Sequence, residues 1–130
     1  MDKYLDTETS YQRLLQEYKK YGSLIIGLDF DDTIFDFHNK GGSYEMVRQL
    51  VRDLYAANCH IIIWTGNEDT AFVSNFLREN NIPYHSINED HPISLKTMGK
   101  KRKLYSNVVI DDRSGLNQVY NELTRLLKEI

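Results

Sequence analysis

Four short apolar runs alternate with helical patterns along this chain, and no other feature of the sequence constrains the fold as strongly. The apolar runs occupy residues 23–29, 60–65, 82–87 and 107–111. Continuous apolar runs of this length are typical of strands buried on both faces of a parallel sheet. Strands that alternate with helices form α/β domains with right-handed crossovers. The sequence therefore predicts an α/β fold: a three-layer, Rossmann-like parallel sheet of at least four strands, flanked by helices.

Apolar residues at helical spacing predict helices between these strands. The first helix is expected over about residues 8–21 and to end at Gly22. Ser43 is the expected N-cap of the second helix, and Asn67 is expected to open the third. The last helix is expected over residues 116–130. The residues expected to face the core are Tyr11, Leu14, Leu15, Tyr18 and Tyr21 in the first helix, Met46, Val47, Leu50, Val51 and Leu54 in the second, Phe72, Val73, Phe76 and Leu77 in the third, and Leu116, Val119, Tyr120, Leu123, Leu126, Leu127 and Ile130 in the last.

Length and composition indicate one globular domain. The 130 residues contain no repeat and no Gly/Ser-rich linker, so we expect a single domain over 1–130, with a helical extension over 1–22, the core motifs over 23–113 and a C-terminal helix over 114–130. A net charge of -3 gives no general attraction to nucleic acid or anionic membranes. Cys59 is the only cysteine, which excludes an intramolecular disulfide. With no apolar segment of about 20 residues and no secretion signal, the expected location is cytoplasmic, without a membrane partner.

Polar residues follow three of the four predicted strands. The letters DFDD come after the first strand, TGN after the second and DDR after the fourth. Ligands of open α/β sheets bind beyond the carboxyl ends of the strands. These three segments are therefore expected to form one site.

Asp29 and Asp31 are the first candidates for catalysis. Residues two apart in an extended segment point to one side, so both carboxylates can face a common pocket. Facing carboxylates repel unless a cation lies between them or one holds a proton. Phosphoryl transfer uses both solutions: one aspartate attacks phosphorus and forms an aspartyl phosphate, and a second acid protonates the leaving oxygen and then deprotonates water. The plain alternative is that the DDT letters form a turn or a helix cap.

The second segment is a candidate phosphate-binding turn. The hydroxyl of Thr65 and the backbone N–H groups of Gly66 and Asn67 could hold a phosphoryl oxygen. A helix beginning near Glu68 would add the partial positive charge of its N-terminus. The alternative is an ordinary strand-to-helix turn.

The last segment offers metal ligands and follows a basic stretch. Asp111 and Asp112 supply the hard oxygen atoms that suit Mg²⁺, and Asp29 with Asp111 fits its use of one or two carboxylates. A salt bridge to Arg113 or to another basic residue is the alternative role for Asp112. Upstream, residues 96–103 carry five basic side chains, of which Lys103 is the expected charge-stabilising lysine and Lys101 the reserve. A solvated face or a nucleic-acid patch is the other interpretation of this stretch.

Together these segments resemble the haloacid dehalogenase superfamily of aspartate-nucleophile phosphohydrolases. Its four motifs occur in order within about residues 23–113: LDFDDT at 28–33, IIIWT up to Thr65, a lysine ahead of the last core strand, and VVIDD. The resemblance implies the following roles: Asp29 as nucleophile and Mg²⁺ ligand, Asp31 as general acid/base with its carbonyl on the metal, Thr65 as phosphate ligand, Lys103 as charge stabiliser, Asp111 as metal ligand and Asp112 as outer-sphere ligand.

Two departures within this resemblance carry information. Asp32 stands where glycine is often found in the family, and no catalytic loss is expected from it. Dehalogenases of the family lack the second acid of the first motif, so Asp31 argues for phosphate chemistry. Only ten residues, 34–43, separate Thr33 from the next helix, which leaves no room for a cap domain. The resemblance then implies a minimal capless member, which acts on a large substrate or forms a homo-oligomer in which a neighbour covers the site.

The function expected from the sequence is a Mg²⁺-dependent phosphatase that hydrolyses a phosphate monoester. The negative net charge favours a small phosphorylated molecule, and the basic stretch leaves a nucleic-acid end open. A phosphoprotein phosphatase, a receiver-like signalling domain and a silent phosphate-binding module are the alternatives. Residues 89–106 form a long polar connection that is expected to border the site and contribute to substrate choice. The four histidines show no metal-ligand spacing, and Trp64 is expected in the core.

Overall fold

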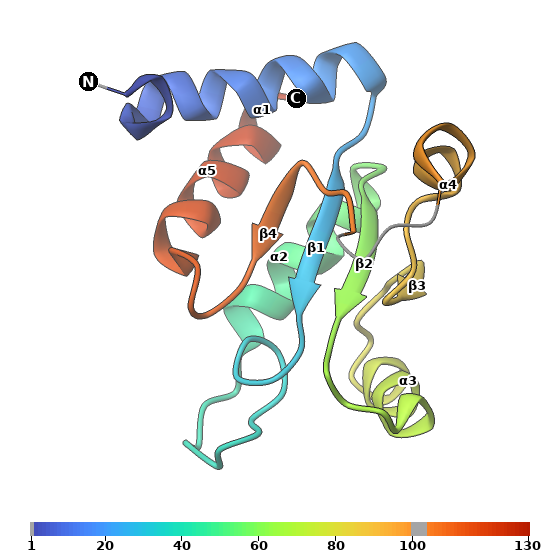
Figure 1. The fold of residues 1–130 in the computed structure, drawn as a ribbon. Coiled ribbons are helices and arrows are strands. Elements are labelled where there is room, and N and C mark those ends of the chain that lie inside the picture. The colour runs from blue at the N-terminus through green and yellow to red at the C-terminus, as the bar shows by residue number, and fades with distance from the viewer. Residues whose placement is uncertain (1, 100–103) are drawn as a thin grey trace.

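A computed structural model describes residues 2–99 and 104–130 as a parallel sheet flanked by helices (Figure 1). The strands are β1 (Ile25–Asp29), β2 (His60–Trp64), β3 (Ser86–Ile87) and β4 (Val108–Ile110). The helices are a 3-10 turn, η1 (Lys3–Leu5), and α1 (Thr7–Tyr21), α2 (Glu45–Ala56), α3 (Thr70–Glu79), α4 (Pro92–Met98) and α5 (Leu116–Glu129). All pairings in the sheet are parallel, in the order β3-β2-β1-β4, which confirms the predicted Rossmann-like α/β fold.

The central strand β1 lies at the switch point of the sheet. It pairs with β2 on one side, where Asp29 lies opposite Trp64, and with β4 on the other, where Leu28 lies opposite Ile110. The chain builds the sheet outward from β1 to β3 and then returns to the other side of β1. Such a reversal leaves a crevice at the carboxyl ends of the two strands concerned, here β1 and β4.

The main core lies on the face of the sheet to which Ile26 and Leu28 point. Both side chains are fully buried, together with Leu50, Leu54 and other residues of α2 and with Leu123 of α5. Burial of these side chains supplies most of the driving force for folding. The opposite face of β1 carries Ile25, Gly27 and the candidate nucleophile Asp29.

The N-terminal helix packs on this core, as its apolar spacing predicts. Tyr11, Leu14 and Leu15 of α1 are buried, and the Tyr18 hydroxyl donates a hydrogen bond to the carbonyl of Ala57. Gly22 ends the helix with φ 68°, a left-handed conformation that glycine adopts without strain. Tyr21 was expected to face the core, but it is exposed because it lies in the last turn, beyond the sheet.

Other helix predictions also require correction, and Ile130, which was expected to face the core, is exposed at the C-cap of α5. Tyr44 rather than Ser43 is the N-cap of α2, and the Ser43 hydroxyl accepts only the N–H of Glu45. Met46 and Phe72 are exposed because each lies in the first turn of its helix, at the rim of the sheet. The third helix begins at Thr70, and its cap is Asp69, whose side chain accepts the N–H of Phe72.

The prediction that residues 89–106 border the acidic site is wrong for the part of this segment that the structure describes. Asn88 reverses the chain with φ 56°, and α4 then lies beside the amino ends of the strands, where the His91 ring contacts His60 (Figure 1). A chain that leaves β3 must return to the amino edge before it can run parallel to β1 as β4. The described residues of the segment therefore lie at the edge opposite Asp29.

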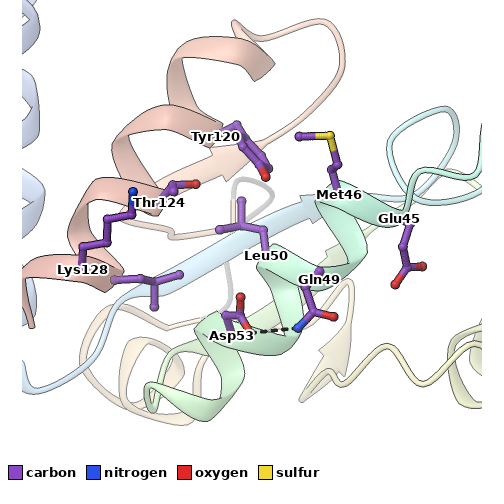
Figure 2. A pocket seen from close by; sticks show the side chains of 9 residues that line it. Glu45, Met46, Gln49, Leu50, Asp53, Tyr120, Thr124 and Lys128 are labelled. Carbon is purple, nitrogen blue, oxygen red and sulfur yellow. Dashed lines mark hydrogen bonds between the residues drawn. The ribbon is translucent and has the colours of Figure 1, made fainter.

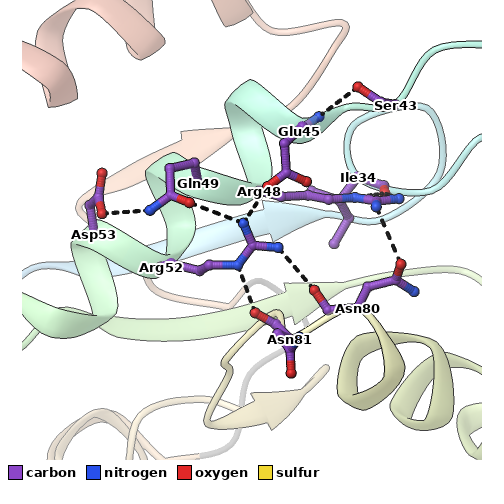
Figure 3. Close-up of polar contacts among 9 residues, drawn as sticks. All are labelled: Ile34, Ser43, Glu45, Arg48, Gln49, Arg52, Asp53, Asn80 and Asn81. Carbon is purple, nitrogen blue, oxygen red and sulfur yellow. Dashed lines mark hydrogen bonds and ion pairs between the residues drawn. The ribbon is translucent and has the colours of Figure 1, made fainter.

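Two arginines of α2 bind neighbouring segments: Arg48 the segment that follows β1, and Arg52 the end of α3 (Figure 3). The Arg48 guanidinium donates two hydrogen bonds, of 3.0 and 2.8 Å, to the carbonyl of Ile34. One turn later, Arg52 donates to the carbonyls of Asn80 and Asn81, at the end of α3. These bonds hold the turn after Asp31 against α2 and α3.

Among the described residues, no helix is long and apolar enough to cross a membrane.

Candidate active site

Three carboxylates come together at the carboxyl ends of β1 and β4. Asp29 ends β1, while Asp111 and Asp112 directly follow β4, and one oxygen of each lies within 4.8 Å of the other two. Leu28 pairs with Ile110, so the parallel register carries Asp29 and Asp111 to the same edge. Asp29 and Asp111 are half-buried and Asp112 is exposed. The structure thus brings together the acids of the first and last predicted motifs.

Thr33 joins these two motifs, and the sequence analysis did not include it among the site residues. Its fully buried hydroxyl lies 2.9 Å from Asp29 Oδ2 and 3.1 Å from Asp112 Oδ1, and it accepts the backbone N–H of Asp112 at 3.0 Å. A hydroxyl has one proton to donate, so the two carboxylates compete for it. The signal in the sequence was the threonine four residues after Asp29 in the letters DFDDT.

The environment of Asp29 favours its protonated form when no cation is bound. Burial, helped by the charges of Asp111 and Asp112 and opposed by the Thr33 hydrogen bond, raises the pKa of Asp29 to about 7. Burial and neighbouring negative charges raise the pKa of a carboxyl group when no positive group offsets them, and no such group is found at Asp29 among residues 2–99 and 104–130. A cation among the three carboxylates would supply one.

Asp31 lies next to this cluster, in a turn that its neighbours stabilise. Burial, followed by the nearby charge of Asp32, raises the pKa of Asp31 above its ordinary value. Among the described residues, nothing donates a hydrogen bond to its buried Oδ1 atom. Asp31 also forms a β-bridge with Phe35. A carboxyl group with a raised pKa retains a proton that it can donate, which is the property of a general acid.

Asp32 is a turn residue. Its φ of 60° is left-handed, a conformation that aspartate tolerates better than most residues and glycine tolerates freely. Its carboxylate contacts the His38 ring and accepts the backbone N–H of His38.

The connection to α2 is ordered around Asp36, which accepts hydrogen bonds from the N–H groups of Lys40 and Gly41 and from the Tyr44 hydroxyl.

Thr65 follows β2 at the same edge of the sheet and is held by Asn88. The Asn88 amide accepts the N–H of Thr65 at 3.0 Å and donates to its carbonyl at 2.8 Å. The Thr65 hydroxyl accepts the N–H of Asn67, and Gly66 is exposed with open space around its Cα. The predicted TGN segment is therefore a side-chain-stabilised turn that faces the same crevice edge as Asp29.

The two candidate lysines, Lys103 and Lys101, lie outside the described residues. Asp112 was given a salt bridge to Arg113 as its alternative role, but its carboxylate lies at the Thr33 hydroxyl instead. The backbone N–H of Arg113 donates to the neighbouring Asp111 at 2.9 Å. Both terminal acids are therefore oriented by groups of the described chain.

Three histidines that are far apart in the sequence meet at the opposite edge. The His60 ring lies 4.1 Å from that of His85 and 4.4 Å from that of His91, measured between ring centroids. The Nδ1 atoms of His85 and His91 each accept a backbone N–H. Their Nε2 atoms then carry the proton in the neutral ring, so this arrangement does not favour a metal site.

A groove of about 500 Å³ lies between α2 and α5 (Figure 2). It does not include Asp29, Asp111 or Asp112. Met46, Leu50, Tyr120 and Leu127 line it. None of the residues that line it belongs to the predicted motifs. The candidate site residues therefore lie at the carboxyl ends of the strands and not in this groove.

Comparison with known proteins identifies a similar fold and no family. No model of a protein family matches the chain, and no curated protein matches it. A solved structure described as "Structure of the conserved protein coded by locus from Bacteroides thetaiotaomicron" is similar with a TM-score of 0.62 and 21% identity. The similarity covers 79% of this chain and 91% of that one. The chain therefore shares its α/β fold with that protein.

Proposed function

We propose that this protein is a Mg²⁺-dependent phosphatase of the haloacid dehalogenase type, which hydrolyses a phosphate monoester through an aspartyl phosphate. The observation that carries the proposal is the cluster of Asp29, Asp111 and Asp112 at the switch point of the sheet, joined through the buried hydroxyl of Thr33. Ligands of open α/β sheets bind at this place.

The donor set fits Mg²⁺. Mg²⁺ prefers oxygen ligands and uses few carboxylates, and the half-buried Asp29 and Asp111 would bind it directly, with Asp112 further out. The raised pKa of Asp29 supports this assignment, because a cation would replace the proton that burial otherwise favours. When bound, Mg²⁺ would neutralise the carboxylates and polarise the phosphoryl oxygens.

In the first half of the reaction, an oxygen of Asp29 attacks phosphorus and the bond from phosphorus to the leaving oxygen breaks. Asp31 gives its proton to that oxygen, so the alcohol departs neutral. Asp31 is suited to this step because burial and the nearby charge of Asp32 raise its pKa, which favours the protonated form that donates.

In the second half, Asp31 takes a proton from water, and the water oxygen attacks phosphorus. The bond between phosphorus and the Asp29 oxygen breaks, which releases inorganic phosphate and restores the carboxylate. The turn of Thr65, Gly66 and Asn67 would bind the phosphoryl oxygens during both steps, and Lys103 is proposed to balance their charge.

The test is hydrolysis of p-nitrophenyl phosphate with and without Mg²⁺ by the wild type, Asp29→Asn and Asp31→Asn. Asp29→Asn is expected to abolish turnover. Asp31→Asn is expected to release about one equivalent of nitrophenol in a burst, because this leaving group needs little protonation whereas the later attack of water still needs a base. Full activity of Asp29→Asn would refute the mechanism. Stable phosphorylation of Asp29 without turnover in the wild type would instead support a receiver-like module.

A further inference from the structure

Trp64 lies beside the candidate nucleophile in the sheet. It is the last residue of β2, and its register partner is Asp29, the last residue of β1. Paired residues of neighbouring strands project their side chains from the same face of a sheet. Trp64 and Asp29 therefore share one face, the face opposite to the main core around Ile26 and Leu28.

The indole of Trp64 covers the part of this face that comes directly before Asp29. A Cβ atom at Gly27 would lie 2.7 Å from the Cε2 and Cζ2 atoms of Trp64, so the ring reaches across from β2 onto β1. Gly27 and Asp29 are successive residues on this face of β1. The nucleophile is thus bordered along its own strand by an apolar ring, while the Thr33 hydroxyl bonds its Oδ2 atom at 2.9 Å.

Stability does not explain a tryptophan at this position. Its Nε1 atom is buried, and among residues 2–99 and 104–130 nothing accepts its proton. A buried donor without an acceptor costs free energy, a cost that a phenylalanine ring does not carry. Gly27, which makes room for the indole, adds the larger loss of chain entropy that glycine suffers on folding. Departures of this kind from the most stable residue are expected at functional sites.

We propose that Trp64 is a positioning residue for the nucleophile: its indole, seated over Gly27, restricts the orientation of the Asp29 carboxylate and keeps water from its side. This inference rests on the proposed phosphatase function and adds a residue to it. An attacking oxygen that is already oriented reaches phosphorus with little further loss of freedom. The ring atoms over Gly27 belong to the six-membered part of the indole, which extends farther from the backbone than a phenylalanine ring does.

The first test measures Trp64→Phe with p-nitrophenyl phosphate at saturating Mg²⁺. We expect kcat to fall about tenfold, since misplacement of a reacting group is costly. The inhibition constant of inorganic phosphate should stay within about twofold, because the variant keeps the turn of Thr65, Gly66 and Asn67 that is proposed to bind it. Urea denaturation followed by circular dichroism should show Trp64→Phe to be at least as stable as the wild type, because the unpaired donor is gone.

The second test reaches the indole from the neighbouring strand. Gly27→Ala displaces the ring and should also lower kcat, whereas in a Trp64→Leu background the same substitution should have little further effect, because the atoms that it meets are absent. Ile63→Val is the matched control. Ile63 is fully buried on the opposite face of β2, so this variant should lose stability and keep kcat.

The outcomes separate this inference from the function on which it rests. Asp29-dependent hydrolysis by the wild type with a kcat of Trp64→Phe within about twofold overturns only the role of Trp64. A parallel change in kcat and in the inhibition constant of phosphate also overturns it, because the effect then passes through the Thr65 turn. Equal effects of Gly27→Ala in both backgrounds have the same consequence. Absence of any Asp29-dependent hydrolysis refutes the proposed function and this inference with it.

Discussion

The hydroxyl of Thr33 accepts a hydrogen bond from the backbone N–H of Asp112 at 3.0 Å and so joins the segment after β1 to the segment after β4. We expect Thr33→Val, which keeps the shape of the side chain, to lower the free energy of unfolding by about 1–3 kcal/mol, because it leaves this N–H and the Asp29 carboxylate without a partner. Urea denaturation measures the change. Thr33→Ser retains the hydroxyl and should lose much less; equal losses in the two variants would contradict this account.

Binding of Mg²⁺ at the acid cluster is expected to stabilise the folded chain. An ion that binds only the native state raises its stability by mass action, and we expect saturating Mg²⁺ to raise Tm by on the order of 5 °C. Asp111→Asn should remove most of this rise, as seen by scanning calorimetry in the absence of substrate. Asp53→Asn is the control, because Asp53 is an exposed acid on α2 and not part of the acid cluster. Its carboxylate accepts a hydrogen bond from the Gln49 amide (Figure 3). An equal rise in Asp111→Asn would argue against this metal site.

The raised pKa of Asp29 predicts a specific pH dependence of stability without metal. The pKa is about 7 in the folded state and about 3.8 in an unfolded chain, so between these values the folded state binds more protons. The free energy of unfolding therefore falls as pH rises through this window. Asp29→Asn should be more stable than the wild type above pH 7, and its advantage should decline as the pH falls toward 4. Urea titrations in EDTA at several pH values test this, and a pH-independent difference would contradict it.

Asn88 is expected to position Thr65 for phosphate binding. Its left-handed φ of 56° is one that glycine also adopts, so Asn88→Gly should preserve the backbone while removing both hydrogen bonds to Thr65. We expect kcat/KM for the phosphate ester to fall about tenfold, since loss of position at a binding group is costly. The inhibition constant of inorganic phosphate should rise in parallel. If the turn has only a structural role, stability will fall while phosphate binding stays the same.

Gly27 is expected to tolerate no side chain. A Cβ atom there would lie 2.7 Å from two ring atoms of Trp64, which packs across β1. We expect Gly27→Ala to cost about 1–3 kcal/mol of stability through overpacking and to alter the fluorescence of this single tryptophan. Gly66→Ala is the control for stability, because nothing lies within 4 Å of the added atom. Unchanged fluorescence and stability in Gly27→Ala would disprove the contact.

The helices, the strands and the edge of the sheet at which the acids gather can all be predicted from local patterns in the sequence. The apolar run before Asp29 and the run before Asp111 are local signals, because strand burial and helix amphipathicity depend on neighbouring residues. The order of motifs also placed Asp29, Asp31, Thr65 and Asp111 at strand ends. Helix starts were less accurate, as at Thr70, since capping depends on which side chain reaches a free N–H group.

Which strand ends become neighbours depends on the folded arrangement of the chain and could not be predicted from these patterns. The pairing of β4 with β1 brings Asp112 to Thr33 across 79 positions of sequence, and it sends the described part of 89–106 to the opposite edge. The same folding assembles His60, His85 and His91, which show no pattern in the sequence. Contacts of this kind arise from the pairing of distant strands and from chain closure, and local periodicity does not encode either.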